Sequence, residues 1–161
     1  MKTTMEHKLV SKWSLWFRDH ESRDWSLDSY KKVFDFDTVE AFWGLMKNIK
    51  YVEHMFFFMK DGITPIFEDE ANQNGGQVSF VLPLKQTLTV LTDLTLRAIS
   101  EQICSDPSYV NGVSLSVKNG RALFKIWIKN IDEFEEKLNN GSISLNGDKT
   151  YFVRYRIKRH E

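Results

Sequence analysis

Apolar and polar residues alternate in several short segments of the chain, and this period of two predicts β-strands. In residues 12–18, Trp13, Leu15 and Phe17 alternate with Trp16 and with polar residues. Both sides of this strand are therefore expected to be occupied. The same period, or a short apolar run between turn residues, predicts further strands over residues 30–36, 54–60, 77–84, 112–118, 121–129 and 150–157.

Three other segments have the helical period, in which apolar residues recur every three to four positions. Residues 38–49 and 88–103 each carry such a stripe. Asp37, with Glu40 three residues later, resembles a capping box that would begin the first of these helices. A shorter helix is expected over residues 130–138.

Asparagine, aspartate and glycine mark the turns between these elements. Asn119-Gly120 separates two alternating segments and predicts the clearest hairpin of the chain. Residues 64–76 are expected to form a loop, with an acidic run and two consecutive glycines. The elements together predict one α+β domain over residues 1–161, in which about eight strands, mostly antiparallel, are covered on one face by about three helices. The other face is then open to solvent or to a ligand.

Composition narrows the class of protein. The chain has 161 residues, of which 42% are hydrophobic, and this excludes wholesale disorder. Its 22 basic residues balance its 22 acidic ones, so that an electrostatic binder of long nucleic acid is not expected. The single cysteine excludes a disulfide framework, and the scattered histidines indicate no metal site. No apolar stretch has the length of a membrane helix or a signal peptide, so we expect a soluble cytoplasmic protein.

Four sequence blocks occur in the order found in a known family. They are H-K-L-V-S-K-W-S-L-W-F (7–17), F-D-T-V-E-A-F-W (36–43), F-M-K-D-G-I-T-P-I-F-E-D-E-A-N-Q-N-G-G (58–76) and the hairpin that ends in I-W (126–127). Together they resemble the eukaryotic translation initiation factor 4E family, which binds the 5′ cap of messenger RNA. The resemblance implies a curved antiparallel sheet with helices on its convex back and a cap-binding slot on the concave side. It also implies an N-terminal strap over residues 1–8, a monomer, no cofactor and no enzymatic activity.

The resemblance assigns four residues to the base of the cap, 7-methylguanosine, which carries a positive charge. Trp25 matches the first stacking tryptophan, and Phe67 stands where the family usually has the second. Glu68 matches the glutamate that accepts hydrogen bonds from the guanine edge, and Trp127 matches the tryptophan beside the N7-methyl group. The residues alone leave other interpretations open: an exposed loop aromatic at Trp25, a core residue at Phe67 or Trp127, and a solvated acidic run from Glu68 to Glu70.

Cations for the cap triphosphate are assigned less directly. Lys118 matches a family arginine, and Arg121 or Lys125 could supply a second positive charge. Leu123 falls at the position of a family lysine, and Gln77 stands where another arginine is usual. These differences predict weaker or differently placed phosphate contacts, and a solvated surface role for each basic residue stays open.

The resemblance also implies a partner surface on the back of the sheet. There the scaffold factor 4G, or a 4E-binding repressor, docks a helix with the pattern Tyr-x-x-x-x-Leu-apolar. Lys8 replaces a family proline and Ser100 a family glycine, so the strap and the edge of the groove could differ. A buried core role for the tryptophan of this surface stays open. The expected surface residues are His7, Val39, Trp43, Asp93 and Leu96.

Three functions are compatible with these patterns. The first is cap binding that recruits a scaffold for translation initiation. The second is a repressor or decoy that keeps the partner surface and binds cap weakly, which Phe67 and Gln77 favour. The third is an enzyme such as a nucleotide hydrolase that uses Glu68, Asp69 or Glu70 as acid and base, although no metal-ligand spacing supports it.

Overall fold

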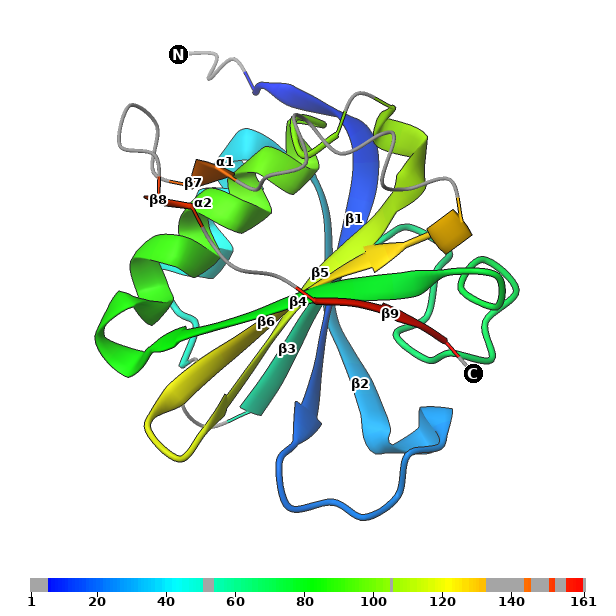
Figure 1. The fold of residues 1–161 in the computed structure, drawn as a ribbon. Coiled ribbons are helices and arrows are strands. Elements are labelled where there is room, and N and C mark those ends of the chain that lie inside the picture. Colours follow the sequence, from blue (N-terminus) through cyan, green and yellow to red (C-terminus); the bar gives the residue numbers. More distant parts are fainter. Residues whose placement is uncertain are drawn as a thin grey trace.

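A computed structural model describes residues 6–50, 54–104, 106–132, 144–145, 151–152 and 156–160. Seven strands form one antiparallel sheet in the order β2-β1-β3-β5-β6-β4-β9 (Figure 1). A separate two-stranded sheet joins β7 (Ser144–Leu145) and β8 (Tyr151–Phe152). The strands of the large sheet are β1 (Lys8–Asp19), β2 (Tyr30–Thr38), β3 (His54–Lys60), β4 (Gly76–Pro83), β5 (Val110–Lys118), β6 (Arg121–Ile128) and β9 (Arg156–Arg159).

Two helices, α1 (Val39–Met46) and α2 (Thr87–Ile99), lie on the same face of this sheet (Figure 1). The α+β prediction is therefore confirmed, with seven strands in the large sheet where about eight were expected. Two α-helices are described where about three were expected. The third predicted helix falls on residues 130–138, of which only the first three are described. Three short 3-10 turns cover Leu27–Ser29, Leu84–Gln86 and Pro107–Tyr109.

The start of α1 differs from the predicted capping box. Thr38 is the N-cap, and its hydroxyl accepts a hydrogen bond from the main-chain nitrogen of Ala41. Asp37 stays in β2, where its carboxylate pairs with Lys8. The carboxylate of Glu40 accepts hydrogen bonds from the main chain of His7 instead. The strand therefore continues two residues beyond the predicted residue 36, and the cap shifts by one residue, from Asp37 to Thr38.

The central strands bury side chains on both faces. In β3, Phe56 and Phe58 face the helices, where they join the main core with Phe42 of α1 and Leu94 of α2. Phe57 and its neighbour Met59 point to the opposite face and pack with Trp127 of β6 in a second, smaller cluster. A strand in the middle of a sheet can be apolar throughout only when both of its faces are covered. Because α1 and α2 cover one face only, the second cluster needs another cover.

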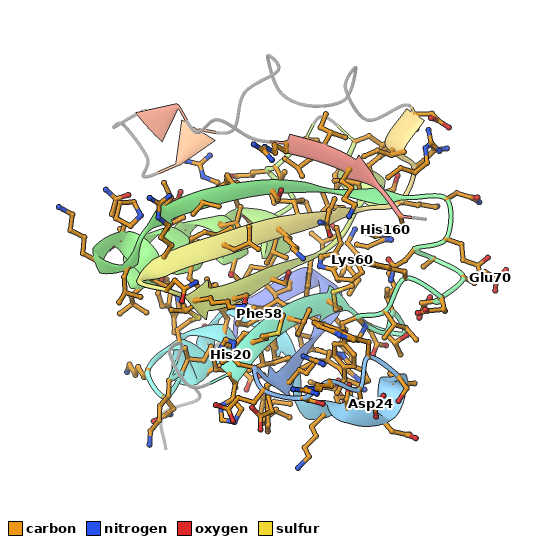
Figure 2. The ribbon with its side chains drawn as sticks, turned by 60° about the horizontal axis from the view of Figure 1, so that its bottom comes forward. His20, Asp24, Phe58, Lys60, Glu70 and His160 are labelled. Atoms are coloured by element: carbon orange, nitrogen blue, oxygen red, sulfur yellow. The ribbon has the colours of Figure 1, made fainter. Side chains whose placement is uncertain are left out.

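Two loops provide that cover. The first, residues 20–29, joins β1 to β2, and the second, residues 61–75, joins β3 to β4. In Figure 1 the second loop lies on the side of the sheet away from the helices, next to the end of β9. Figure 2 labels Asp24 in the first loop and Glu70 in the second. The predicted hairpin also forms: Asn119 and Gly120 both have a positive φ, as a two-residue turn requires.

Candidate functional site

A hollow of about 160 Å³ lies between these two loops and the uncovered face of the sheet. Apolar side chains make its floor, and the loops supply its walls. Because cross-strand partners in an antiparallel sheet share a face, the register fixes which side chains the floor contains. The lining residues that matter below are Trp25, Tyr30, Phe67, Glu68, Lys125 and Trp127.

Trp127 is the fixed point of the floor. Its indole is buried, and Nε1 donates a hydrogen bond to the Ser114 hydroxyl at 3.1 Å. Phe57 packs against it edge-on, with ring centroids 6.3 Å apart. Trp127 is thus buried, as the core interpretation predicts, and it also lines the hollow.

Phe67 forms one wall and is 42% exposed, so it is not a core residue. Its ring stacks on His160, with centroids 4.2 Å apart and planes 23° from parallel. It also leans on Trp127 at 5.6 Å. One face of Phe67 is therefore covered from behind, and the ring is held in place before any ligand arrives.

His160 follows β9 and is buried behind this wall (Figure 2). Its main-chain nitrogen donates to the carbonyl of Gly75, and Nδ1 lies 3.2 Å from the carbonyl oxygen of Asn72. A carbonyl only accepts, so Nδ1 carries the proton. Nε2 has no hydrogen-bond partner in the described part of the chain. Burial lowers the pKa of His160, and Lys125 and Lys158 act in the same direction, so the imidazole is neutral.

The loop that carries Phe67 is braced by its own side chains. The Asp69 carboxylate accepts hydrogen bonds from the main-chain nitrogen and hydroxyl of Thr64 and from the nitrogen of Ala71. Asn72 donates to the carbonyls of Thr64 and Ile66. Asp69 was expected to belong to a solvated acidic run. Its carboxylate instead holds the loop in shape, because it accepts hydrogen bonds from main-chain nitrogens that the turn leaves without another partner.

Glu68 follows Phe67 directly and is exposed at the rim of the hollow. Its carbonyl accepts a hydrogen bond from the Gln73 side chain, whereas its carboxylate has no hydrogen bond to a described residue. Tyr30 lies within reach of its charge: burial raises the pKa of Tyr30, and Glu68 adds to that rise against the opposite effect of Arg18. The carboxylate is thus available to accept hydrogen bonds from a ligand.

Trp25 lines the hollow from the first loop, as Phe67 does from the second, and is 60% exposed. The guanidinium carbon of Arg18 lies 3.5 Å from the centroid of its ring. Arg18 is only 1% exposed, and it donates hydrogen bonds to the carbonyls of Ser22 and Asp24 at 2.8 and 2.7 Å. The indole is therefore an exposed loop aromatic whose loop is tied to β1 by a buried cation.

Positive charges flank the hollow on the side of β9. Lys125 lines it, opposite Ser79 on β4, and Ser79 in turn lies opposite Arg156 on β9. Two residues further along β9, Lys158 lies opposite Gln77 of β4, and Gln77 in turn lies opposite Trp127 of β6. Burial lowers the pKa of Lys125, and the charge of Lys158 lowers it further, so these two ammonium groups are close enough to repel.

Two of the predicted cations do not line the hollow. Lys118 and Arg121 face each other at the tip of the hairpin, four positions along β5 and β6 from Ser114 and Lys125. At about 3.3 Å per residue, that is roughly 13 Å away. The short Asn119-Gly120 turn ends the hairpin there. Leu123 and Gln77, the two positions where the family resemblance leads one to expect a basic residue, carry no charge, and Gln77 is buried with its Oε1 lacking a hydrogen bond to any described group.

Comparison with known proteins agrees with this geometry. The model of the family described as eukaryotic initiation factor 4E matches residues 8–155. The chain belongs to the eukaryotic initiation factor 4E family. Eukaryotic translation initiation factor 4E of Saccharomyces cerevisiae is 35% identical over 141 residues, 80% of this chain and 65% of the yeast protein. The Candida albicans factor is 33% identical over 145 residues, 82% of this chain and 69% of its own length. This 4E-family chain thus spans about two thirds of these relatives.

A solved structure has the same fold. It is the complex of C. elegans eIF4E-3 with the 4E-binding protein Mextli and a cap analog, with a TM-score of 0.74 and 25% identity. The superposition covers 80% of this chain and 78% of that one. The relatives are named as translation initiation factors, which are binding proteins and not enzymes, and this agrees with the sequence prediction. None of the described helices of this 4E-family chain has both the length and the apolarity needed to cross a bilayer.

The predicted partner surface lies on the other face of this 4E-family chain, around α1 and α2. Trp43 is 41% exposed, so it is not the buried core residue that the helix pattern left open. The carbonyl of His7 accepts a hydrogen bond from the nitrogen of Val39, and its imidazole pairs with Glu40. That contact, together with the main-chain bond from His7, lowers the pKa of Glu40 to about 2. On α2, Asp93 pairs with Arg97, and Leu96 is partly buried.

Four residues around the hollow were not predicted from the sequence: Arg18, His160, Lys158 and Arg156. Arg18 had a local signal, because a charged residue sits in a strand predicted to be occupied on both faces. Of the other three, only Arg156 falls in the strand predicted over residues 150–157; in the structure β9 covers Arg156–Arg159, and no local pattern identifies β4 as its partner. Among the described residues, no group of three or more His, Cys, Asp or Glu side chains is placed to hold a metal ion.

Acid should destabilise this 4E-family chain through His160. Because the pKa of His160 is lowered in the folded chain, the unfolded chain binds more protons than the folded chain at pH values just below the ordinary histidine pKa of about 6.5. Its contribution to the free energy of unfolding is complete above that value and is lost as the pH falls through the lower folded pKa. Urea denaturation between about pH 7 and 5.5 measures this loss. The His160→Phe variant keeps a ring behind Phe67 without the titration, and it should show a flatter slope; identical slopes would contradict the assignment.

Proposed function

We propose that this 4E-family chain binds the 7-methylguanosine cap of messenger RNA in the hollow between its two loops. The observation that carries this proposal is the meeting of four groups at one site: the rings of Trp25, Phe67 and Trp127 and the unengaged carboxylate of Glu68. The C. elegans eIF4E-3 structure is a complex that includes a cap analog, which supports the same ligand class here.

Two exposed aromatic rings on opposite walls suit a flat, positively charged base. Stacking contributes roughly 1–3 kcal/mol per base and accepts any base. The charge of the N7-methylated ring adds a cation–π attraction of about 0.5–2 kcal/mol, strongest for indole. Because Phe67 replaces the usual tryptophan, the attraction on that face is weaker here. Trp127 is an apolar lining residue of the same hollow, against which the N7-methyl group would pack.

Glu68 supplies the base specificity. A carboxylate can accept hydrogen bonds from N1–H and the 2-amino group of guanine together, and such charge-assisted pairs are strong. Adenine presents no such pair of donors. Asp69 cannot take this role, because its oxygens already bind the backbone of the loop.

Glu68→Gln should weaken binding of 7-methyl-GTP by roughly tenfold to a hundredfold, because one of two charge-assisted hydrogen bonds becomes a donor–donor clash. Calorimetric titration measures the loss, and 7-methyl-ATP should bind the variant and the wild type equally weakly. Glu70→Gln is the matched control, since it removes the same charge two residues away. A loss of equal size in the control would assign the effect to net charge rather than to base reading.

In this proposal the triphosphate lies over the cross-strand residues of β6, β4 and β9. Lys125, Lys158 and Arg156 provide positive charge there, where Leu123 and Gln77 provide none. Burial and, after it, the charge of Lys158 lower the pKa of Lys125, and a polyanion between the two ammonium groups would relieve the second of these effects. Lys118 and Arg121 stay at the hairpin tip, so the phosphate contacts are relocated rather than lost.

Replacing Lys158 by Gln should weaken 7-methyl-GTP binding by roughly three- to tenfold and leave the nucleoside 7-methylguanosine almost unchanged, because only the charged tail reaches this residue. Lys118→Gln, at the far end of the same face, serves as the matched control and should change neither ligand. Competition titrations with both ligands give the two ratios. If Lys118→Gln produced the larger loss, the hairpin tip and not β9 would hold the phosphates.

The back surface is proposed to bind the helix of a scaffold factor 4G or of a 4E-binding repressor, through the pattern Tyr-x-x-x-x-Leu-apolar. An exposed Trp43 on α1 and a partly buried Leu96 on α2 fit helix-in-groove recognition, and the C. elegans complex contains a 4E-binding protein. Cap binding on one face and scaffold binding on the other would together recruit messenger RNA for translation in the cytoplasm. A repressor would use the same two faces.

Trp43→Ala should reduce binding of a peptide with this pattern by at least tenfold, because a large aromatic at the centre of an interface usually dominates its energy. Fluorescence anisotropy of a labelled peptide measures the affinity. Trp25→Ala, on the opposite face, is the control and should leave peptide binding intact. Peptide affinity that survives Trp43→Ala would place the partner surface elsewhere.

The whole proposal is tested on 7-methylguanosine-Sepharose. The wild-type chain should be retained, should elute with 7-methyl-GTP and should resist elution with GTP. Failure to bind would contradict cap recognition and would favour the decoy, which keeps the partner surface alone. Turnover of a capped dinucleotide during the assay would instead favour the hydrolase alternative.

A further inference from the structure

A buried positive charge lies behind one of the two ring walls. Arg18 donates hydrogen bonds to the carbonyls of Asp19, Ser22 and Asp24 and to the Ser29 hydroxyl, so none of these bonds ends on a carboxylate. The guanidinium covers one face of the Trp25 ring at 3.5 Å. Most of the remaining indole surface is exposed, and Arg18 does not line the hollow. A base in the hollow must therefore approach the other face of Trp25.

The two walls are consequently unequal. The face of Phe67 away from the hollow carries a neutral imidazole, that of His160, whereas the corresponding face of Trp25 carries a full positive charge. A ring attracts a cation through the negative potential of its face, and a cation already on one side offsets that potential on the other. If the methylated base stacks on Trp25 at the same distance as Arg18 does on the other face, the charge of the base and that of the guanidinium lie roughly 7 Å apart. This separation is within the screening length of physiological salt.

We propose that Arg18 sets the methyl specificity of the site: it fixes the Trp25 loop for stacking and at the same time reduces the preference of Trp25 for a 7-methylated over an unmethylated guanine. This inference rests on the proposed function and deepens it. The two effects of Arg18 separate physically. Its hydrogen bonds to the loop support stacking of either base, whereas its charge acts only against the base that is itself charged. Phe67 then provides most of the discrimination, although an indole would ordinarily provide more.

The charge is tested with a matched pair of variants. Arg18→Met removes the charge and the loop anchors, and Arg18→Lys keeps the charge while losing most of the anchors. Calorimetry gives the Kd of each variant for 7-methyl-GTP and for GTP. The ratio of the GTP value to the 7-methyl-GTP value should rise at least threefold in Arg18→Met, even if both ligands bind more weakly, and should stay within twofold of the wild type in Arg18→Lys. An unchanged or smaller ratio in folded Arg18→Met overturns the inference.

A second comparison leaves Arg18 in place and so does not depend on how its variants fold. In the otherwise wild-type chain, Trp25→Leu should weaken 7-methyl-GTP and GTP by similar factors, and Phe67→Leu should lower the ratio of the two Kd values severalfold. A Trp25→Leu variant that lowers this ratio as much as Phe67→Leu overturns the inference. A wild-type chain that binds neither nucleotide contradicts the proposed function itself, and the inference falls with it; selective binding that does not respond as described contradicts the inference alone.

Discussion

The site depends on strands that are apolar on both faces. The helices cover one face of β3 and β6, and the apolar side chains on the other face, Phe57, Met59 and Trp127, have to be shielded by something else. The two loops bury these three side chains, and the exposed aromatic surface at the hollow belongs to the rings of Trp25 and Phe67, which are 60% and 42% exposed. Burying such aromatic surface is worth several kcal/mol. A flat ligand that completes the cover is therefore favoured before any specific hydrogen bond is made.

The loops differ in how they are stiffened. The loop with Phe67 is braced by short side chain–backbone hydrogen bonds from Asp69 and Asn72 and by a ring stacked behind it. The loop with Trp25 also has short bonds of its own, such as the one from the main-chain nitrogen of Ser26 to the Asp24 carboxylate, but in addition a buried cation reaches it from β1. Ordering such groups in advance lowers the entropic cost of binding. The same devices also set the electrostatic environment of each ring, so stiffness and specificity are coupled in this chain.

Much of this could be predicted from sequence. Alternation and turn chemistry identified the strands, and the family resemblance identified Trp25, Phe67, Glu68 and Trp127, which the structure brings to one hollow. The cations were harder. Counting along the chain assigned Lys118, but a two-residue turn shortens the hairpin and leaves Lys118 at its tip. The pairing of β9 with β4 brings three more residues to the neighbourhood of the site: Arg156, Lys158 and His160. Because many residues separate the two strands along the chain, this pairing leaves no local signal in the sequence.

The central claim is that a charged, methylated purine lies flat between Trp25 and Phe67 with its methyl group against Trp127. Proton NMR of 7-methyl-GTP with the protein tests this most directly, because a methyl group held against aromatic faces has its resonance shifted strongly upfield. We expect that shift, together with nuclear Overhauser contacts from the methyl protons to the Trp127 ring, and their loss in Trp25→Ala. A bound ligand whose methyl resonance stays at its solution position, with contacts only to side chains outside the hollow, would contradict it.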